Sequence, residues 1–183
     1  MPGEKFLHVV AFNIPYPPDY GGIIDIYYKV KALHRLGIAV KLHCFQYDRE
    51  PDPALREITT ELHVYPRGSG LKYFAGGLPY IVSTRSSKTL AENLLSDPHP
   101  VLFEGLHTTL LLDACKAAGK VVAVRTHNIE HNYYRMLSRS ERNLYRKLYL
   151  RIESKRLKKY EPVLEKADHI FSISTTDADY FTD

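Results

Sequence analysis

The stretch HPVLFEGLHTTLLLDACKAAGKVVAVRT, residues 99–126, decides the fold class. It contains two short apolar runs, at residues 99–105 and 121–126, separated by a helix-like segment over 108–118 that ends at Gly119. Apolar runs without polar alternation indicate strands that are buried on both faces. A buried strand, a helix and a second buried strand in this order predict parallel strands joined by a crossover helix.

The same alternation extends outward from this stretch in both directions. Toward the amino terminus we predict strands over 6–12, 38–45 and 62–65 and helices over 23–36 and 87–95, while 71–84 is ambiguous. Toward the carboxyl terminus we predict a long basic helix over 145–164, bent or ended by Pro162, then a strand over 167–174 and a helix from 175. We therefore expect one α/β domain over residues 1–183, with a Rossmann-like, mostly parallel sheet and helices on both faces.

The composition is that of an ordinary globular protein. Of the 183 residues, 44% are hydrophobic and 25% are charged, which excludes global disorder. The apolar runs are far shorter than the ~18 residues of a membrane span, and the first residues do not resemble a secretory signal, so we expect a cytoplasmic protein. Cys44 and Cys115 lie in apolar stretches and are predicted to be buried side chains rather than a disulfide, metal ligands or nucleophiles.

The positive charge is concentrated in one segment. Residues 139–166 contain ten Lys or Arg and four Glu, whereas the net charge of the whole chain is only +4. The predicted apolar face of this helix consists of Tyr145, Tyr149, Ile152, Tyr160 and Leu164. Such a pattern is typical of a surface helix on the core, of a helix on anionic lipid, and of a nucleic-acid-binding segment. We expect an anionic membrane surface and no nucleic acid as partner, with four candidate contacts: Lys155, Arg156, Lys158 and Lys159.

The loop after the first predicted strand has the composition of a phosphate site. In α/β sheets, ligands bind at the carboxyl ends of the strands. The segment YPPDYGG, residues 16–22, places Gly21 and Gly22 at the start of a helix, where backbone N–H groups and the helix dipole favour an anion. It contains neither GxGxxG nor GxxxxGK[ST], and a plain Gly-Gly turn is the alternative interpretation.

Polar residues also follow two later strands. Glu104 and His107, in EGLH, suit acid/base chemistry or a hydroxyl-rich ligand; alternatively, His107 opens a helix and Glu104 is a solvated rim residue. In RTHNIEHNYY, the stretch His127 to His131 matches the HxxEH pattern of inverted zinc peptidases. Because His127 is expected at a strand end, the helical spacing of two zinc ligands is doubtful, and we predict no metal site.

A short acidic motif near the carboxyl terminus has a structural interpretation. Asp177 and Asp179 form DxD, a metal-diphosphate pattern of some sugar transferases. The motif lies at the start of a predicted helix, where Asp is favoured as a cap.

Together these motifs resemble the N-terminal domain of glycosyltransferase family 4, retaining enzymes of the two-Rossmann GT-B fold. The resemblance covers most of the chain and rests on four segments in order: YPPDYGG, VLFEGLH, VVAVRTHN and YEPVLEKADHIFSISTTDADYF. The family's second domain, with two glutamates spaced eight apart that bind the nucleotide and the sugar, has no counterpart in these 183 residues. We therefore expect an N-terminal half that does not transfer sugar alone.

The resemblance also implies substrates and site residues. It implies a nucleotide-sugar donor, a glycan or lipid-linked acceptor, no metal or other cofactor, and a role in cell-surface polysaccharide or glycolipid synthesis at the inner face of the plasma membrane. Gly21 and Gly22 would face the donor diphosphate, and His127 would hydrogen-bond the transferred sugar, with Glu104 as a second catalytic candidate. The acceptor would contact Tyr16, His107 and Asn128. The alternatives are a non-catalytic phosphate- or sugar-binding module and a zinc hydrolase that uses HNIEH.

Overall fold

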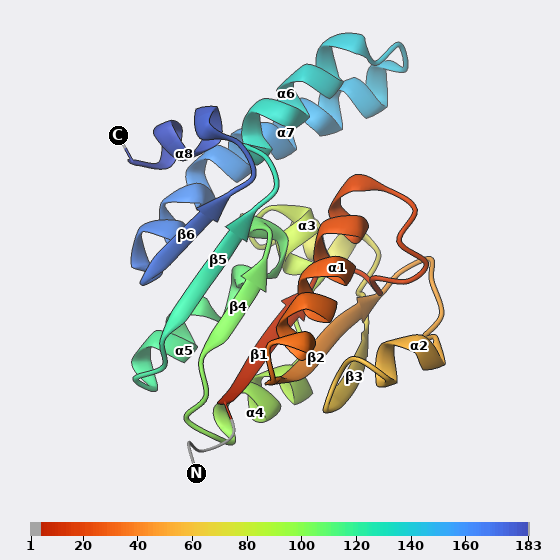
Figure 1. The fold of residues 1–183 in the computed structure, drawn as a ribbon. Helices are drawn as coiled ribbons and strands as arrows, with labels where there is room; N and C mark the ends of the chain where they lie inside the picture. The colour runs from red at the N-terminus through yellow and green to blue at the C-terminus, as the bar shows by residue number, and fades with distance from the viewer. Residues whose placement is uncertain (1–4, 183) are drawn as a thin grey trace.

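The computed structural model describes residues 5–182 and contains one six-stranded sheet in which all paired strands are parallel (Figure 1). The strands are β1 Lys5–Ala11, β2 Ile38–Gln46, β3 Glu61–Pro66, β4 Val101–Glu104, β5 Val122–Thr126 and β6 His169–Ser172. Their order, β3-β2-β1-β4-β5-β6, is that of a doubly wound Rossmann sheet, whose topological switch point lies between β1 and β4. The predicted fold class is confirmed.

Helices cover both faces of the sheet (Figure 1). They are α1 Gly21–Arg35, α2 Pro53–Arg56, α3 Tyr80–Ser83, α4 Lys88–Leu95, α5 Leu112–Ala117, α6 Glu130–Ser140, α7 Leu144–Tyr160 and α8 Thr175–Thr182, with 3-10 segments η1 Leu71–Phe74, η2 Leu106–Leu111 and η3 Glu161–Lys166. Successive strand residues point to opposite faces. Val9 therefore packs in one cluster with α1 and α2, and Val10 packs in another with α3, α4, α5 and α7.

Several element boundaries differ from the prediction. Helix α1 begins at Gly21, two residues earlier than expected, so both glycines lie in its first turn. The helix predicted over 108–118 consists of η2 followed by α5, and the ambiguous stretch 71–84 contains η1 and α3. Helix α7 ends at Tyr160, just before Pro162, which confirms that Pro162 marks the end of the basic helix.

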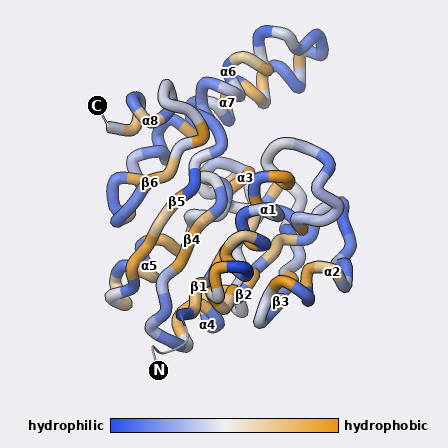
Figure 2. Tube along the Cα trace, viewed as in Figure 1, coloured by the Kyte–Doolittle hydropathy of each residue, from blue (hydrophilic) through white to orange (hydrophobic). Residues whose placement is uncertain are grey.

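Helix α6 was not predicted, and with α7 it forms a hairpin that extends past the carboxyl ends of the strands (Figures 1 and 2). The apolar face predicted for α7 is wrong at two of its positions. Tyr145 is 88% exposed and Ile152 is 45% exposed, whereas Leu150 and Leu157 are buried. The buried side of α7 also includes Glu153, so apolar spacing alone did not identify it.

A chain of hydrogen bonds crosses one buried face of the sheet. His8 Nε2 lies 3.0 Å from Asp97 Oδ1, His8 Nδ1 lies 2.9 Å from His43 Nε2, and His43 Nδ1 lies 2.8 Å from the Tyr65 hydroxyl. The chain ends at Asn93, whose Nδ2 donates to the Tyr65 oxygen at 2.8 Å. Because Asp97 is an acceptor, neutral rings satisfy the whole chain, with Tyr65 donating to His43, His43 to His8 and His8 to Asp97. Burial lowers the pKa of both imidazoles, and that of His43 falls to about 2.

The predicted burial of the two cysteines is confirmed, because Cys44 and Cys115 are both fully buried free thiols. Burial raises the pKa of the Cys115 thiol to about 11 and also raises that of Cys44. Among the helices of residues 5–182, none combines the length and the apolar character needed to cross a membrane.

Candidate functional site

The segments that follow β1, β4 and β5 meet around the side chain of His127. A Cβ atom added to Gly22 would lie 2.9 Å from the Phe12 ring and 3.9 Å from His127 Nδ1. A Cβ atom on Gly105 would lie 2.8 Å from His107 Nδ1 and 3.5 Å from His127 Cδ2, and Gly105 has a φ of +78°. Glycine at these two positions thus allows the start of α1 and the turn after β4 to approach the same imidazole.

The first turn of α1 has no side-chain cap. Tyr20 occupies the N-cap position without a side-chain hydrogen bond, and the first turn contains no acidic residue. Gly21 is exposed, and no atom would contact a Cβ placed on it within 4 Å. The N–H groups at this helix end therefore have no side-chain acceptor, which is the arrangement that receives an anion in phosphate-binding folds.

The His127 imidazole is held from one side only. Its side chain is 6% exposed, and Nε2 lies 3.2 Å from Glu104 Oε2, so Nε2 carries the hydrogen and donates it. Among residues 5–182 the buried Nδ1 has no hydrogen-bond partner, and the Asp25 carboxylate oxygen is 3.9 Å away. Leaving a buried polar atom without a partner costs about 1–3 kcal/mol, so Nδ1 is available to a water molecule or a ligand.

Two carboxylates and two cations lie beneath this imidazole. Lys29 Nζ donates to both oxygens of the fully buried Glu104 at 2.8 Å and to Asp25 at 2.9 Å. Arg125 donates to Asp25 at 3.2 Å. Burial alone would raise the Asp25 pKa, but the hydrogen bonds from Lys29 and Arg125 hold it below its ordinary value. The charges of the four groups balance, and they fix Glu104 against His127.

Three of these side chains form the one group within residues 5–182 that could hold a metal ion. One potential ligand atom each of Asp25, Glu104 and His127 lies within 4.8 Å of the others. Lys29 and Arg125 together already balance the charges of the two carboxylates. The two histidines of HNIEH do not converge, because His127 contacts Glu104 whereas His131 Nδ1 lies 2.9 Å from Glu161. Nothing in this geometry favours the zinc hydrolase, and the absence of a metal requirement remains a prediction.

A second polar cluster lies beside the first. Glu130 is 3% exposed, with Oε2 3.8 Å from His107 Nε2, while Glu130 Oε1 and His107 Nδ1 have no partner. Burial raises the pKa of Glu130 to about 7, although a hydrogen bond from Asn128 partly lowers it. Burial and the positive charge of Arg85 lower the pKa of His107. Arg85 is 5% exposed and donates to the Phe12 carbonyl at 3.0 and 3.1 Å, which fixes the loop after β1.

The structure brings most of the predicted ligand-binding residues together. Gly21, Gly22, Glu104, His107 and His127 all lie at the switch point. Glu104 is not a solvated rim residue; it is buried behind His127.

The other two predicted binding residues are Tyr16 and Asn128. Tyr16 is half-buried against Tyr27, with ring centroids 5.8 Å apart, and Asn128 is exposed next to Glu130. Ser174, rather than an aspartate of the DxD motif, caps α8, because its Oγ accepts from the Asp177 N–H at 3.1 Å.

The basic candidates differ in exposure. Lys155, Lys158 and Lys159 are exposed, but Arg156 is half-buried and donates to the Phe74 carbonyl at 2.9 Å. Arg156 is therefore a structural contact between α7 and η1 as well as a surface cation.

Sequence reasoning missed five residues of the site, which come from four different segments: Phe12, Asp25, Lys29, Arg85 and Arg125. Their only signal in the sequence was the cluster of polar residues near Arg125. Each contributes through a partner that is distant in sequence, such as Lys29 with Glu104, 75 residues apart.

No protein-family model and no curated protein matches the chain. Function is therefore inferred from the fold and from the geometry around His127.

Proposed function

We propose that the chain is the N-terminal half of a retaining glycosyltransferase. The enzyme would transfer a sugar from a nucleotide-sugar donor to a glycan or lipid-linked acceptor. It would act in cell-surface polysaccharide or glycolipid synthesis at the cytoplasmic side of a membrane. One observation carries the proposal: the buried, unpartnered Nδ1 of His127 lies beside the uncapped first turn of α1, at the switch point of the sheet. The family resemblance of the sequence supports the same assignment.

The donor diphosphate is assigned to the first turn of α1. Gly21 and Gly22 leave the backbone N–H groups accessible, and the 15-residue helix directs its positive dipole end toward the ligand. In the retaining reaction that the resemblance implies, the leaving phosphate accepts the proton of the acceptor hydroxyl. N–H groups aimed at that phosphate stabilise the negative charge that develops on it, which favours the transition state.

The transferred sugar is assigned to His127. Because Nε2 donates its hydrogen to Glu104, Nδ1 of the neutral ring can accept a hydrogen bond from a sugar hydroxyl. Nδ1 of a protonated ring would instead donate a hydrogen bond to a phosphate oxygen. In this account Glu104 is a positioning residue, because it is fully buried and reaches the ligand only through His127.

The Phe12 ring packs beside the two histidines of the site. It lies edge-on to the His127 ring, with centroids 5.6 Å apart, and 5.3 Å from the His107 ring. The acceptor is assigned to His107, Asn128 and Tyr16.

The proposal is tested by titrating the purified chain with pyrophosphate, uridine diphosphate and uridine diphosphate glucose in a calorimeter. His127→Ala should weaken binding of the sugar nucleotide by about tenfold, the value of one hydrogen bond to a ligand. His169→Ala is the matched control, because His169 is exposed on β6. Failure of pyrophosphate to bind, which needs only the first turn of α1, would contradict the proposal. Equal affinity of the His127 variant and the parent for a sugar nucleotide that binds would also contradict it.

A further inference from the structure

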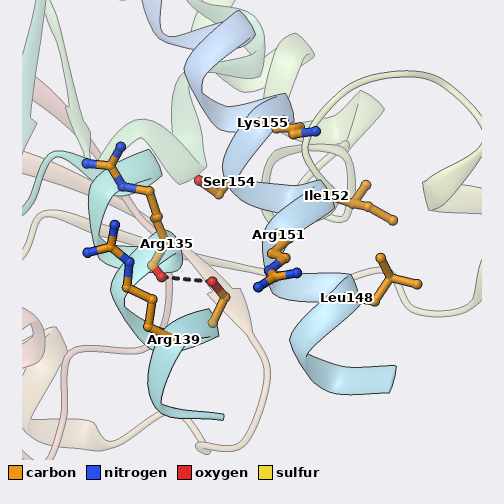
Figure 3. Close-up of a pocket in the computed structure, with 8 residues that line it drawn as sticks. Arg135, Arg139, Leu148, Arg151, Ile152, Ser154 and Lys155 are labelled. Carbon is orange, nitrogen blue, oxygen red and sulfur yellow. Dashed lines mark hydrogen bonds between the residues drawn. The ribbon is translucent and has the colours of Figure 1, made fainter. Parts of the chain in front are cut away.

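The α6–α7 hairpin carries a basic groove that is separate from the proposed sugar-nucleotide site. The groove has a volume of about 490 Å³ and is lined by four cations and two apolar side chains: Arg135, Arg139, Arg151, Lys155, Leu148 and Ile152 (Figure 3). Arg135 and Arg139 extend in the same direction from α6, one helical turn apart, and Arg151 and Lys155 are likewise one turn apart on α7 (Figure 3).

None of these four cations is paired with a carboxylate among residues 5–182. Arg135 donates only to the side-chain oxygen of Asn132, at 2.7 Å, and the other three have no side-chain partner in that part of the chain. By contrast, Lys29 near the proposed site is paired with two acidic residues. Four uncompensated positive charges around one groove repel one another and attract anions, so the groove is electrostatically complementary to a dense negative surface.

Large apolar side chains lie exposed next to these cations. Leu144, Leu148 and Ile152 follow one another at helical spacing along α7 and are 77%, 57% and 45% exposed, and Tyr145 is 88% exposed. Exposed apolar residues flanked by Lys and Arg are typical of helices that lie in the interface of an anionic bilayer. The hairpin extends away from the sheet, so a flat surface can reach it (Figure 1).

We propose that the α6–α7 hairpin binds the surface of an anionic phospholipid membrane. Lipid phosphates occupy the basic groove, while Leu144, Tyr145 and Leu148 enter the boundary between headgroups and acyl chains. Aliphatic side chains predominate here, whereas single-stranded nucleic acid is bound mainly by aromatic stacking platforms. This surface includes Lys155 and excludes the half-buried Arg156, and it does not depend on the chain being a transferase.

The test is co-sedimentation of the full chain with phosphatidylcholine vesicles that contain or lack phosphatidylglycerol. We expect binding to the anionic vesicles alone, and weaker binding as salt is raised. Replacing the four groove cations with Gln should weaken partitioning by several hundredfold at low salt, because the attractions of the four basic residues to an anionic surface add. The matched control removes the same charge from four cations elsewhere on the surface and should bind like the parent: Arg35, Arg56, Lys72 and Lys88, also replaced by Gln.

A second variant tests the apolar half of the surface. Leu144→Ser with Leu148→Ser should weaken partitioning while leaving its salt dependence unchanged, because the charges remain. Circular dichroism and thermal unfolding show whether each variant stays folded. The proposal is overturned if the parent binds equally to vesicles with and without phosphatidylglycerol, or if the groove variant and its control partition equally. It is also overturned if the parent binds single-stranded RNA through the groove but does not bind vesicles.

Discussion

Lys29→Met tests the charged group beneath the site. Lys29 Nζ donates to both oxygens of Glu104 at 2.8 Å, and Glu104 is fully buried. Within residues 5–182, the one other side chain that donates to the Glu104 carboxylate is His127, at 3.2 Å. Methionine keeps the length of the side chain but removes the ammonium, so the Glu104 charge loses its cation while it stays out of water. Asp25 is less affected, because Arg125 still donates to it.

Lys29→Met is expected to lower the free energy of unfolding by a large amount for a single substitution. Removing one partner of a buried ion pair costs about 3–5 kcal/mol, because the other charge is left uncompensated. Since Lys29 itself is 22% exposed, some water reaches the pair, and we take the lower end, about 3 kcal/mol. For a chain of this size that corresponds to a fall in Tm of about 10 °C.

The assay is urea unfolding of three variants beside the parent. Lys31→Met is the matched control, because Lys31 lies on the same helix and contacts the Tyr27 ring without an acidic partner within residues 5–182. Adding Glu104→Gln to Lys29→Met removes the buried charge and should restore part of the stability. The reasoning is refuted if Lys29→Met loses no more than the Lys31 control, or if Glu104→Gln gives no recovery.

Two further predictions concern the glycine turn and the buried histidine chain. Gly22→Ala should lower the free energy of unfolding by about 1–3 kcal/mol, because the added Cβ would lie 2.9 Å from the Phe12 ring. Gly21→Ala should be neutral or stabilising, because no described atom lies within 4 Å of its added Cβ. Thermal unfolding of the two variants measures the difference, and equal effects would contradict the prediction. The free energy of unfolding should rise with pH from about pH 5 to pH 7, because the lowered pKa values of His8, His43 and His107 mean that these imidazoles bind protons more readily in the unfolded chain. The raised pKa of Glu130, about 7, opposes this trend by about the contribution of one histidine. Urea unfolding at pH 7.5 and pH 5 measures the change, up to about 1.4 kcal/mol per pH unit for each histidine, and a flat profile would count against the hydrogen-bond chain.

The strands and the parallel character of the sheet were predictable because the strands are continuous apolar runs, a signal that depends on local sequence alone. Helix α6 gave no such signal, since its buried residues are the polar Glu130, His131 and Ser138. For α7 the predicted apolar face is wrong only toward the outer part of the helix, which extends past the sheet and leaves Tyr145 and Ile152 exposed.

The candidate site was predictable only in outline. Gly22, Glu104 and His127 follow directly from the rule that ligands bind at the carboxyl ends of strands. What surrounds them depends on contacts between distant segments. Lys29 reaches Glu104 from a helix on one face of the sheet, and Arg85 reaches the Phe12 carbonyl from the end of α3. A single sequence carries no local signal for such pairs.

The central claim is that the Nδ1 atom of His127 and the first turn of α1 bind one ligand. Nuclear magnetic resonance of the nitrogen-15-labelled chain, titrated with uridine diphosphate glucose, tests it most directly. The account predicts that the amide signals of Gly21 and Gly22 and the Nδ1 signal of His127 shift together, with one affinity, while His169 does not shift. Shifts confined to the basic α6–α7 groove, with the two glycine amides and His127 unchanged at saturation, would contradict it.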